Sequence, residues 1–305
     1  MNHDSRMITI IINPISGTGG RPEIARQRAE AAAQWTGVGG VDAQIFVTER
    51  PGHARDLARS AVAGGGRLVV AWGGDGTVNE VASELAFTDV ALGMMPSGSG
   101  NGLARELGLP LDPRAALEVA LGGAERLIDA GELDGHLFFN LAGIGLDARV
   151  AHRFAQDGLV RRGFGRYLEI AMREIFTYKA DEHALTFDGG ETIRVRAMLI
   201  AIANGRQYGN NACIAPHARL DDGRLDVIVV AERPAVEALL EVPRVFTGTV
   251  DRVRGVTSRK AESVEISSAL PVLFHVDGEP LVGSARIVAR ARPGALRVRV
   301  APLKS

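Results

Sequence analysis

The chain has 305 residues, of which 46% are hydrophobic and 23% charged, a balance typical of a folded globular protein and not of a disordered one. Its formal net charge of −1 and the lack of a long basic run argue against nucleic acid as a partner. A single cysteine, Cys213, excludes an intrachain disulfide and fits a reducing cytoplasm. No apolar run approaches the roughly 18 residues of a membrane-spanning helix, so we expect any membrane contact to be peripheral.

Strand-like and helix-like segments alternate through the first 128 residues. Short apolar runs predict strands at residues 7–12, 41–47, 68–72 and 90–95, and the segments between them predict helices at residues 22–35, 53–63, 78–87 and 103–107. This alternation is typical of an α/β fold with a doubly wound, mostly parallel sheet. We therefore expect a first domain over residues 1–128.

Three of the predicted strands end in glycine-bearing loops, at residues 13–20, 73–76 and 96–102. Ligands of parallel α/β sheets bind at the carboxyl ends of the strands, so we expect the three loops to converge on one site. Each loop alone is a weak signal, because glycine and serine are common in ordinary turns. Together they predict a ligand site.

The loop Gly73-Gly74-Asp75-Gly76-Thr77 is the strongest of the three, because it joins an apolar strand to a helix. Its glycines let the backbone approach a bulky anion, and the helix N-terminus favours a phosphate group. Thr77 and Glu80 have the spacing of a capping box, which would fix the helix start. The Asp75 carboxylate would repel a phosphate unless a cation stood between them, which predicts Mg²⁺ carried with a nucleotide.

After residue 128 the pattern changes to alternating strands joined by Asp-Gly turns. The turns that begin at Asp134, Asp188 and Asp277 predict three hairpins of an antiparallel, β-rich second domain over residues 129–305. Helices are expected near residues 148–154 and 167–178. The tail predicts strands at residues 285–291 and 296–300, and the last strand can return to the first domain.

Further motifs follow in a fixed order. They are Thr48 with Gly52-His53-Ala54, Phe139-Asn140 with Gly145-Leu146-Asp147-Ala148, Ala203-Asn204-Gly205, Ala215-Pro216 with residues 220–226, and Asp277-Gly278-Glu279. Together with residues 13–17, 73–81 and 96–104, their order and spacing resemble the diacylglycerol kinase catalytic-domain lipid kinases, a family that includes soluble bacterial lipid kinases, sphingosine kinases and ceramide kinases. The resemblance covers nearly the whole chain.

The resemblance implies a two-domain kinase that uses ATP and Mg²⁺. Its first domain would be an NAD kinase/diacylglycerol kinase-like nucleotide-binding domain, and its β-rich second domain would receive the lipid. The implied reaction transfers the γ-phosphoryl group to a hydroxyl of a membrane lipid such as diacylglycerol. The residues implied to contact the nucleotide are Asn13, Pro14, Ser16, Gly17, Thr48, Gly73, Gly74, Asp75, Gly76, Thr77, Asn79, Ser99 and Asn101.

The resemblance also implies a general base and a structural metal ion. Glu279, in the family's late Asp-Gly-Glu motif, is the first candidate for the base, and Asp75 is the second; such a group contributes about 10²–10⁴-fold to the rate. A structural Mg²⁺ would be held by the Asp222 carboxylate and the main-chain carbonyls of Arg219 and Arg224. Oxygen ligands of this kind suit a small hard cation.

Departures from the family pattern leave the acceptor open. Gly102 stands where diacylglycerol kinases usually carry an acidic residue, so a sphingoid base stays an alternative acceptor. Residues 209–211 also replace the glycine run of many bacterial members with Gly-Asn-Asn. The motifs assign no role to His53 or His275.

Other classes fit less well. An NAD kinase-like nucleotide kinase shares the Gly-Gly-Asp-Gly-Thr loop, but the chain lacks the Gly-Phe-Leu segment that such kinases place on a later strand. A dehydrogenase is disfavoured because Pro22 replaces the third glycine of its phosphate-binding motif. A nucleotide-binding sensor without turnover is the non-enzyme alternative. The sequence leaves the oligomeric state open, including a homodimer.

Overall fold

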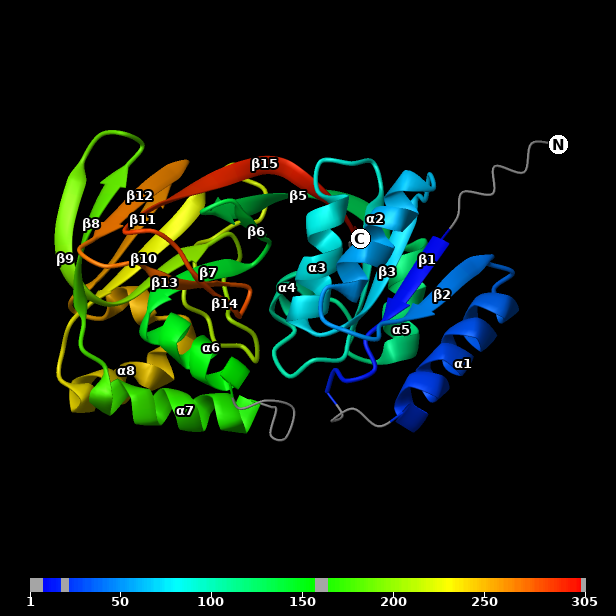
Figure 1. Cartoon of the computed structure of the whole chain (residues 1–305), viewed down its shortest axis with the longest axis horizontal. Coiled ribbons are helices and arrows are strands. Elements are labelled where there is room, and N and C mark those ends of the chain that lie inside the picture. The colour runs from blue at the N-terminus through cyan, green and yellow to red at the C-terminus, as the bar shows by residue number, and fades with distance from the viewer. Residues whose placement is uncertain (1–7, 18–21, 157–163, 303–305) are drawn as a thin grey trace. The chain divides into compact units, whose positions relative to one another are not determined.

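The computed structural model describes residues 8–17, 22–156 and 164–302 and divides the chain into two compact units (Figure 1). The first unit consists of Met1–Ile128 and Gly294–Ser305, and the second consists of Asp129–Pro293. Two strands, β5 (Ala124–Leu133) and β15 (Arg286–Val300), begin in one unit and end in the other.

Four parallel strands form the centre of the first unit: β1 (Ile8–Ile12), β2 (Ala43–Val47), β3 (Leu68–Gly73) and β4 (Ala91–Pro96). They pair in the order β4-β3-β1-β2. Strands β1, β3 and β4 are buried along their whole length, as expected for apolar strands covered on both faces. The end of β15 extends this sheet, with Val298 opposite Leu92 of β4.

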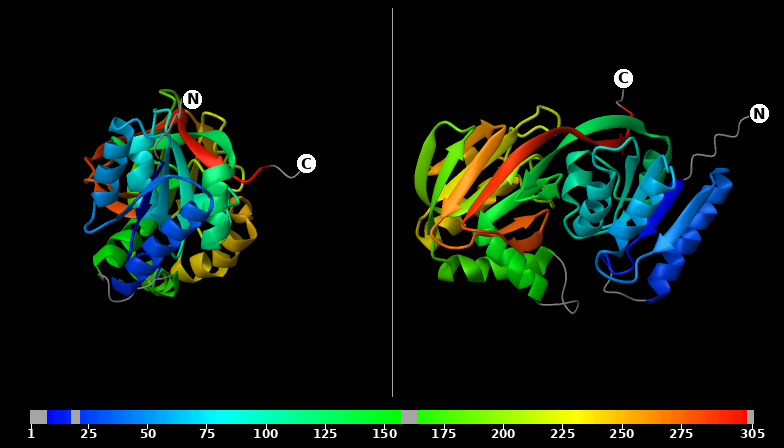
Figure 2. Two further views of the ribbon diagram at one scale, coloured as in Figure 1. Left: turned by 90° about the vertical axis from the view of Figure 1, so that its right-hand side faces the viewer. Right: turned by 45° about the horizontal axis from the view of Figure 1, so that its top comes forward.

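Among the described residues, four helices cover the two faces of this sheet: α1 (Pro22–Val38), α2 (His53–Ala63), α3 (Asp75–Leu85) and α5 (Pro113–Gly122). The short helix α4 (Gly102–Glu106) follows the loop after β4. Ile10 and Val70 pack in one core with side chains of α1 and α5. Successive strand residues point to opposite faces, so the neighbouring Ile11 faces the other side, where α2 and α3 contact β1 and β3 (Figure 2). The predicted doubly wound α/β architecture is confirmed.

The second unit is built on antiparallel strands, in addition to the parts of β5 and β15 that it contains. The strands pair in the order β14-β13-β7-β9-β8-β12-β15, and β10 pairs with β9 and β11. The bounds are β6 His136–Phe138, β7 Leu141–Gly145, β8 Asp181–Phe187, β9 Thr192–Ala203, β10 Leu225–Ala231, β11 Val256–Ala261, β12 Ser263–Ser268, β13 Leu273–Val276 and β14 Glu279–Val282.

The three predicted hairpins of this unit are all present. Asp134, Asp188 and Asp277 have φ values of 49°, 49° and 46°, and each is followed by a glycine that also has a positive φ. Two successive residues with positive φ are what the tight hairpin turn requires, and the Asp-Gly pair allows them at low steric cost. The turns join β5 to β6, β8 to β9 and β13 to β14.

Three α-helices lie along one side of the second unit (Figure 1): α6 (Leu146–Gln156), α7 (Phe164–Thr177) and α8 (Ala235–Thr247). A short 3₁₀ turn, η2 (Val250–Arg252), follows α8. The sequence predicted α6 and α7 but not α8, which contains Pro243 and has no buried residue. None of the helices in residues 8–17, 22–156 and 164–302 is long and apolar enough to cross a membrane.

The prediction of two separate tail strands is wrong. Strand β15 runs through Pro293 and Gly294 without a break. It pairs with β12 over residues 286–290 and with β4 at Val298, so backbone pairing on both sides of the Pro-Gly dipeptide keeps the strand continuous.

Candidate functional site

The three glycine-bearing loops leave the ends of β1, β3 and β4, which are neighbours in the sheet. The backbone bonding of the sheet continues into the loops: Asn13 N donates to Trp72 O at 2.9 Å, and Ser97 N donates to Gly73 O at 2.8 Å. The loops therefore start side by side, as the sequence predicted. Residues 18–20 of the first loop lie outside the described residues.

The first and second loops are joined by a side-chain hydrogen bond. Asn13 Nδ2 donates to Thr77 Oγ1 at 2.8 Å, while Asn13 Oδ1 accepts from Ile15 N at 3.1 Å. The capping box predicted for Thr77 and Glu80 is wrong. The N-cap residue is Gly74, so Thr77 lies inside the first turn of α3, and its hydroxyl holds the first loop instead of capping the helix.

The first and third loops meet at two serines, whose hydroxyl oxygens Ser16 Oγ and Ser97 Oγ lie 2.7 Å apart. Gly17 has a φ of +76°, and a Cβ at this position would lie 2.1 Å from Ser97 O. Only glycine fits there without moving the backbone of the third loop.

Arg28 of α1 holds the backbone of the first loop. Its guanidinium donates to Asn13 O at 2.8 Å and to Ser16 O at 3.0 Å, and it lies 5.7 Å from the centre of the Trp72 ring. Burial lowers the pKa of Arg28. Sequence reasoning missed this residue, because it lies on a helix outside every motif.

The second and third loops are joined by Asp75. Its carboxylate accepts hydrogen bonds from Asn101 N at 2.8 Å and from Gly102 N at 2.6 Å, the N-cap and first residue of α4. Asn101 has a φ of +52° and binds Gly98 through both its side-chain oxygen and nitrogen. A Cβ on Gly98 would lie 2.7 Å from Gly74 Cα, so the two loops touch through their backbones. Asp75 therefore organises the third loop, a role that the sequence did not predict.

The other residues expected to contact nucleotide lie at different depths. Thr48 N donates to Ile12 O at 2.8 Å, which places the half-buried Thr48 at the same edge of the sheet as the first loop. Asn79 is buried within α3, and Pro14 is half-buried. Gly76 and Ser99 are exposed, and a Cβ on Gly76 would meet nothing within 4 Å.

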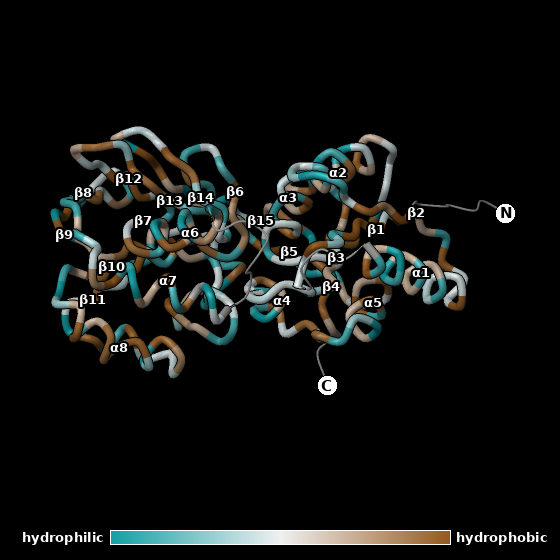
Figure 3. Tube along the Cα trace, turned by 60° about the horizontal axis from the view of Figure 1, so that its bottom comes forward, coloured by the Kyte–Doolittle hydropathy of each residue, from teal (hydrophilic) through white to brown (hydrophobic). Residues whose placement is uncertain are grey.

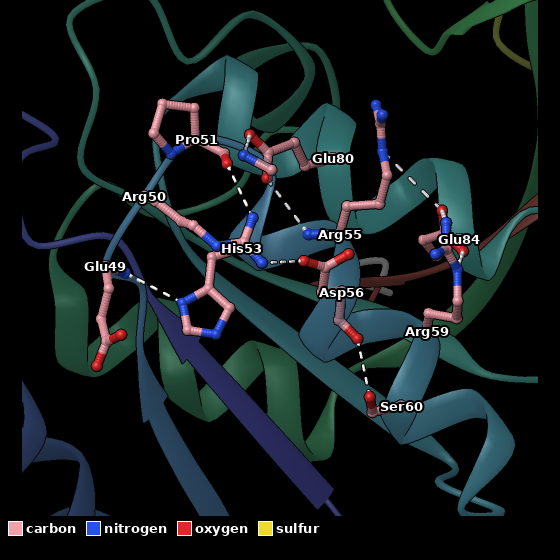
Figure 4. Close-up of polar contacts among 11 residues, drawn as sticks. Glu49, Arg50, Pro51, His53, Arg55, Asp56, Arg59, Ser60, Glu80 and Glu84 are labelled. Carbon is pink, nitrogen blue, oxygen red and sulfur yellow. Dashed lines mark hydrogen bonds and ion pairs between the residues drawn. The ribbon is translucent and has the colours of Figure 1, made fainter.

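Glu80 and Glu84 connect α3 to α2 (Figure 4). The Glu80 carboxylate accepts from Gly52 N at 3.1 Å and from Arg55 N at 3.3 Å, two N–H groups at the start of α2. Glu84 pairs with Arg59 at 2.9 Å. A carboxylate from α3 thus occupies the start of α2. The N-terminus of α3 lies at the three loops, and the first N–H groups of a helix have no partner within it, so this end can bind an anion.

In the second unit, the turn between β13 and β14 carries the Asp-Gly-Glu motif. The Asp277 carboxylate accepts from Phe139 N at 2.9 Å, Asn140 N at 3.1 Å and Leu141 N at 3.0 Å, so it fixes the turn to the start of β7. Glu279 is exposed, and within the described residues no hydrogen bond or ion pair holds its carboxylate. It is therefore the acidic side chain of this motif that can reach outward.

A side-chain cation from β11 lies beside the predicted metal segment. Lys260 Nζ lies 2.6 Å from Asp222 Oδ2 and 3.0 Å from a carboxylate oxygen of the buried Asp226. Burial raises the pKa of Asp226, and the Lys260 ammonium opposes that effect. In residues 8–17, 22–156 and 164–302 no group of three His, Cys, Asp or Glu side chains could hold a metal ion, so an ion here would need main-chain oxygens such as those of Arg219 and Arg224.

Comparison with known proteins identifies both parts of the chain. Residues 7–133 match the family described as diacylglycerol kinase catalytic domain, and residues 140–300 match the YegS C-terminal NAD kinase beta sandwich-like domain. The chain therefore belongs to the diacylglycerol kinase-like family of lipid kinases and is itself a lipid kinase.

Individual proteins similar to this chain carry lipid kinase or diacylglycerol kinase names. A protein of Pseudomonas aeruginosa described as "Probable lipid kinase YegS-like" is 33% identical over 284 residues, which cover 90% of this chain and 89% of the relative. A diacylglycerol kinase of Mycobacterium tuberculosis is 32% identical over 270 residues, 87% of this chain and 86% of the relative. The crystal structure of a diacylglycerol kinase from Bacillus anthracis str. Sterne matches with a TM-score of 0.71 at 20% identity, covering 97% of each chain, and so shares the fold.

Proposed function

We propose that this lipid kinase transfers the γ-phosphoryl group of ATP to a hydroxyl group of a membrane lipid, with diacylglycerol as the first candidate. The observation that carries the proposal is the joining of three loops by Asn13, Thr77, Asp75 and Asn101 at the N-terminus of α3. A backbone surface of this kind suits phosphate groups, because N–H donors neutralise charge on phosphoryl oxygens without moving during the reaction.

The nucleotide is proposed to lie on the three loops with Mg²⁺ bound to its phosphates. Asn13, Pro14, Ser16, Gly17 and Thr48 border it from the side of the first loop. Gly73, Gly74, Gly76 and Thr77 offer backbone donors beneath the phosphates, and Ser99 approaches from the third loop. Mg²⁺ would supply positive charge to offset that of the phosphoryl oxygens, and the Asp75 carboxylate, the acidic side chain among these residues, would help to hold it.

Glu279 is the proposed general base, and Asp75 the second candidate. The contacts favour Glu279, because the two carboxylate oxygens of Asp75 already accept hydrogen bonds from Asn101 N and Gly102 N. Asp277 is committed in the same way to three backbone N–H groups. An exposed carboxylate can approach a substrate hydroxyl and accept its proton.

A labelled-ATP assay tests this function. The protein is incubated with radiolabelled ATP, Mg²⁺ and mixed vesicles that contain diacylglycerol and a sphingoid base. The buffer also contains NAD⁺, and the products are separated by chromatography. Labelled phosphatidic acid is the expected product. A labelled sphingoid base or NADP⁺ would assign the acceptor to one of the alternatives, and ATP binding without any labelled product would favour a sensor.

The role of Glu279 is tested in the same assay. Glu279→Gln keeps the side-chain volume but cannot accept a proton, so kcat should fall by at least about 10²-fold while ATP affinity is unchanged. Glu182→Gln is the matched control, because Glu182 is an exposed strand glutamate of the same unit. A Glu279→Gln variant with near-wild-type kcat would move the base to Asp75 or to solvent.

A structural Mg²⁺ at Asp222, with the carbonyl oxygens of Arg219 and Arg224, is also proposed. The oxygen donors suit the ion, and a bound ion would order the loop before β10. It must compete with Lys260, whose ammonium group already contacts Asp222 at 2.6 Å. Comparing the melting temperature in Mg²⁺ and in chelator tests the proposal; identical melting under both conditions would leave Lys260 as the cation of this loop.

Peripheral membrane contact is proposed for the exposed apolar side chains of α7 and α8. Phe176 of α7 is 61% exposed, and Val236 and Leu240 of α8 are 63% and 73% exposed, which is unusual for large apolar residues on two helices in contact. Figure 3 shows apolar stretches along α8. A lipid surface suits such a face, because burying it in the headgroup region removes apolar area from water.

Vesicle sedimentation tests this contact. Leu240→Glu should lower the fraction of protein bound to phosphatidylglycerol vesicles. Val38→Glu is the matched control, because Val38 is 83% exposed on α1 of the first unit. Equal binding by both variants would contradict the assignment to α8, and sedimentation without vesicles reports whether the protein is a monomer or a homodimer.

A further inference from the structure

A buried polar cluster lies behind the turn that carries Glu279. His275 of β13 is 2% exposed and Asp147 of α6 is 6% exposed. His275 Nε2 lies 3.3 Å from Asp147 Oδ2, and Tyr208 Oη donates to the same oxygen at 3.0 Å. On its other side, His275 Nδ1 lies 3.2 Å from Gly278 N, directly before Glu279.

The contacts of His275 determine which nitrogen carries the proton. A backbone N–H can only donate, so the bond from Gly278 requires His275 Nδ1 to be the acceptor. The proton of the neutral ring is then on Nε2, where it faces the Asp147 carboxylate. Both nitrogens of the ring are thus used, one toward α6 and one toward the turn.

The cluster fits tightly against β7. A Cβ on Gly143 would lie 1.8 Å from Asp147 Oδ2 and 2.6 Å from His275 Nε2, so the backbone of β7 leaves no space for the ring to move in that direction. Asp147 also accepts from Ala148 N at 2.8 Å, which fixes its carboxylate at the start of α6. His275 is therefore held in one orientation.

We infer that His275 is a positioning residue for Glu279, held in place by Asp147. Within the described residues, strand β14 lies at the edge of the sheet and pairs only with β13, so the direction of Glu279 depends on the turn before it. Asp277 holds one side of that turn, and His275 holds the Gly278 N–H on the other. The inference rests on the proposed function, in which Glu279 is the general base. His275 itself is buried, so we assign it a positioning role and not a catalytic one.

The test compares two substitutions of His275 with a buried histidine elsewhere in the unit. His275→Met fills a similar volume but offers neither the acceptor nor the donor, and Tyr208 still pairs with Asp147. His275→Gln restores an oxygen acceptor and an N–H donor. His183→Met is the control, because His183 of β8 is 4% exposed and its Nδ1 lies 3.1 Å from Asp181 O.

We expect His275→Met to lower kcat by about 10–10²-fold with an unchanged KM for ATP, since a small displacement of a reacting group costs rates of this size. His275→Gln should recover most of kcat. The Gly278 amide should lose its protection from hydrogen exchange in His275→Met and keep it in His275→Gln. His183→Met should lower the melting temperature alone.

Three results would overturn the inference. They are a kcat of His275→Met within about twofold of wild type, a His275→Gln variant as defective as His275→Met, and unchanged Gly278 protection in His275→Met. Combining His275→Met with Glu279→Gln should give no further loss of kcat, and an additive loss would show that His275 does not act through Glu279. If the wild-type protein phosphorylates no lipid, the proposed function fails, while the exchange of the Gly278 amide still decides whether His275 holds the turn.

Discussion

Replacing Asp75 with asparagine should lower the free energy of unfolding of the ligand-free protein. The two carboxylate oxygens accept from Gly102 N and Asn101 N at 2.6 and 2.8 Å. Asparagine keeps one acceptor and turns its NH₂ group toward the other N–H donor. Losing one hydrogen bond to a charged group costs about 1.5–3 kcal/mol. For the first unit, in which Asp75 lies, this loss of free energy corresponds to a fall in melting temperature of about 5–10 °C.

The assay is thermal unfolding without ligand, followed by ATP titration in Mg²⁺ by calorimetry. Asp89→Asn is the matched control, because the Asp89 side chain is 97% exposed and pairs with Arg297 across 3.1 Å. Such surface pairs contribute about 0–1 kcal/mol. If ligand-free Asp75→Asn melts with the wild type and only its ATP affinity falls, Asp75 acts on the ligand alone and its role in organising the third loop is refuted.

Three further outcomes follow from particular contacts. Gly98→Ala should lower both melting temperature and ATP affinity, because its Cβ would lie 2.7 Å from the backbone of the second loop. Gly76→Ala is the control and should not lower the melting temperature, because its Cβ would meet nothing within 4 Å. Equal melting temperatures of the two variants would contradict the close backbone contact at Gly98. Burial raises the pKa of Tyr178 to about 12, so as pH rises this phenol ionises in the unfolded chain before it does in the folded protein. The free energy of unfolding should therefore fall between about pH 10 and about pH 12, and urea titrations of Tyr178→Phe should lack this fall. Lys260→Met removes the ammonium group that pairs with Asp222, so the melting temperature should depend on Mg²⁺ more strongly than in the wild type. An unchanged dependence would count against Mg²⁺ binding at Asp222.

The parts of the fold that local chemistry determines could be predicted from the sequence. The apolar run at residues 68–72 has to be buried, and it lies in β3. Asp-Gly pairs such as Asp277-Gly278 allow two successive positive φ values, so they mark hairpins. The convergence of the glycine loops follows from strand order in a parallel sheet, because every strand of that sheet ends at the same edge.

What the sequence did not predict are contacts chosen by tertiary packing. A capping box is a local rule, but Glu80 finds the N–H groups of Gly52 and Arg55 once α2 packs beside α3. Asp75 and Asn101 are 26 positions apart, and only the folded sheet brings them together. Arg28 binds the backbone of the first loop only after α1 packs against the sheet, so no sequence spacing predicts this contact.

The strand β15 has a consequence for the order in which the protein is made. Its last residues complete the first unit: Ala295 O accepts from Phe87 N at 2.7 Å, Arg299 donates to Gly123 O at 2.8 Å, and Val298 pairs with Leu92 on β4. Most of the first unit leaves the ribosome long before these residues do. Until they emerge, β4 lacks this neighbour and exposes part of its edge, the kind of backbone that pairs with other chains. The whole of the second unit must be synthesised before the first can close.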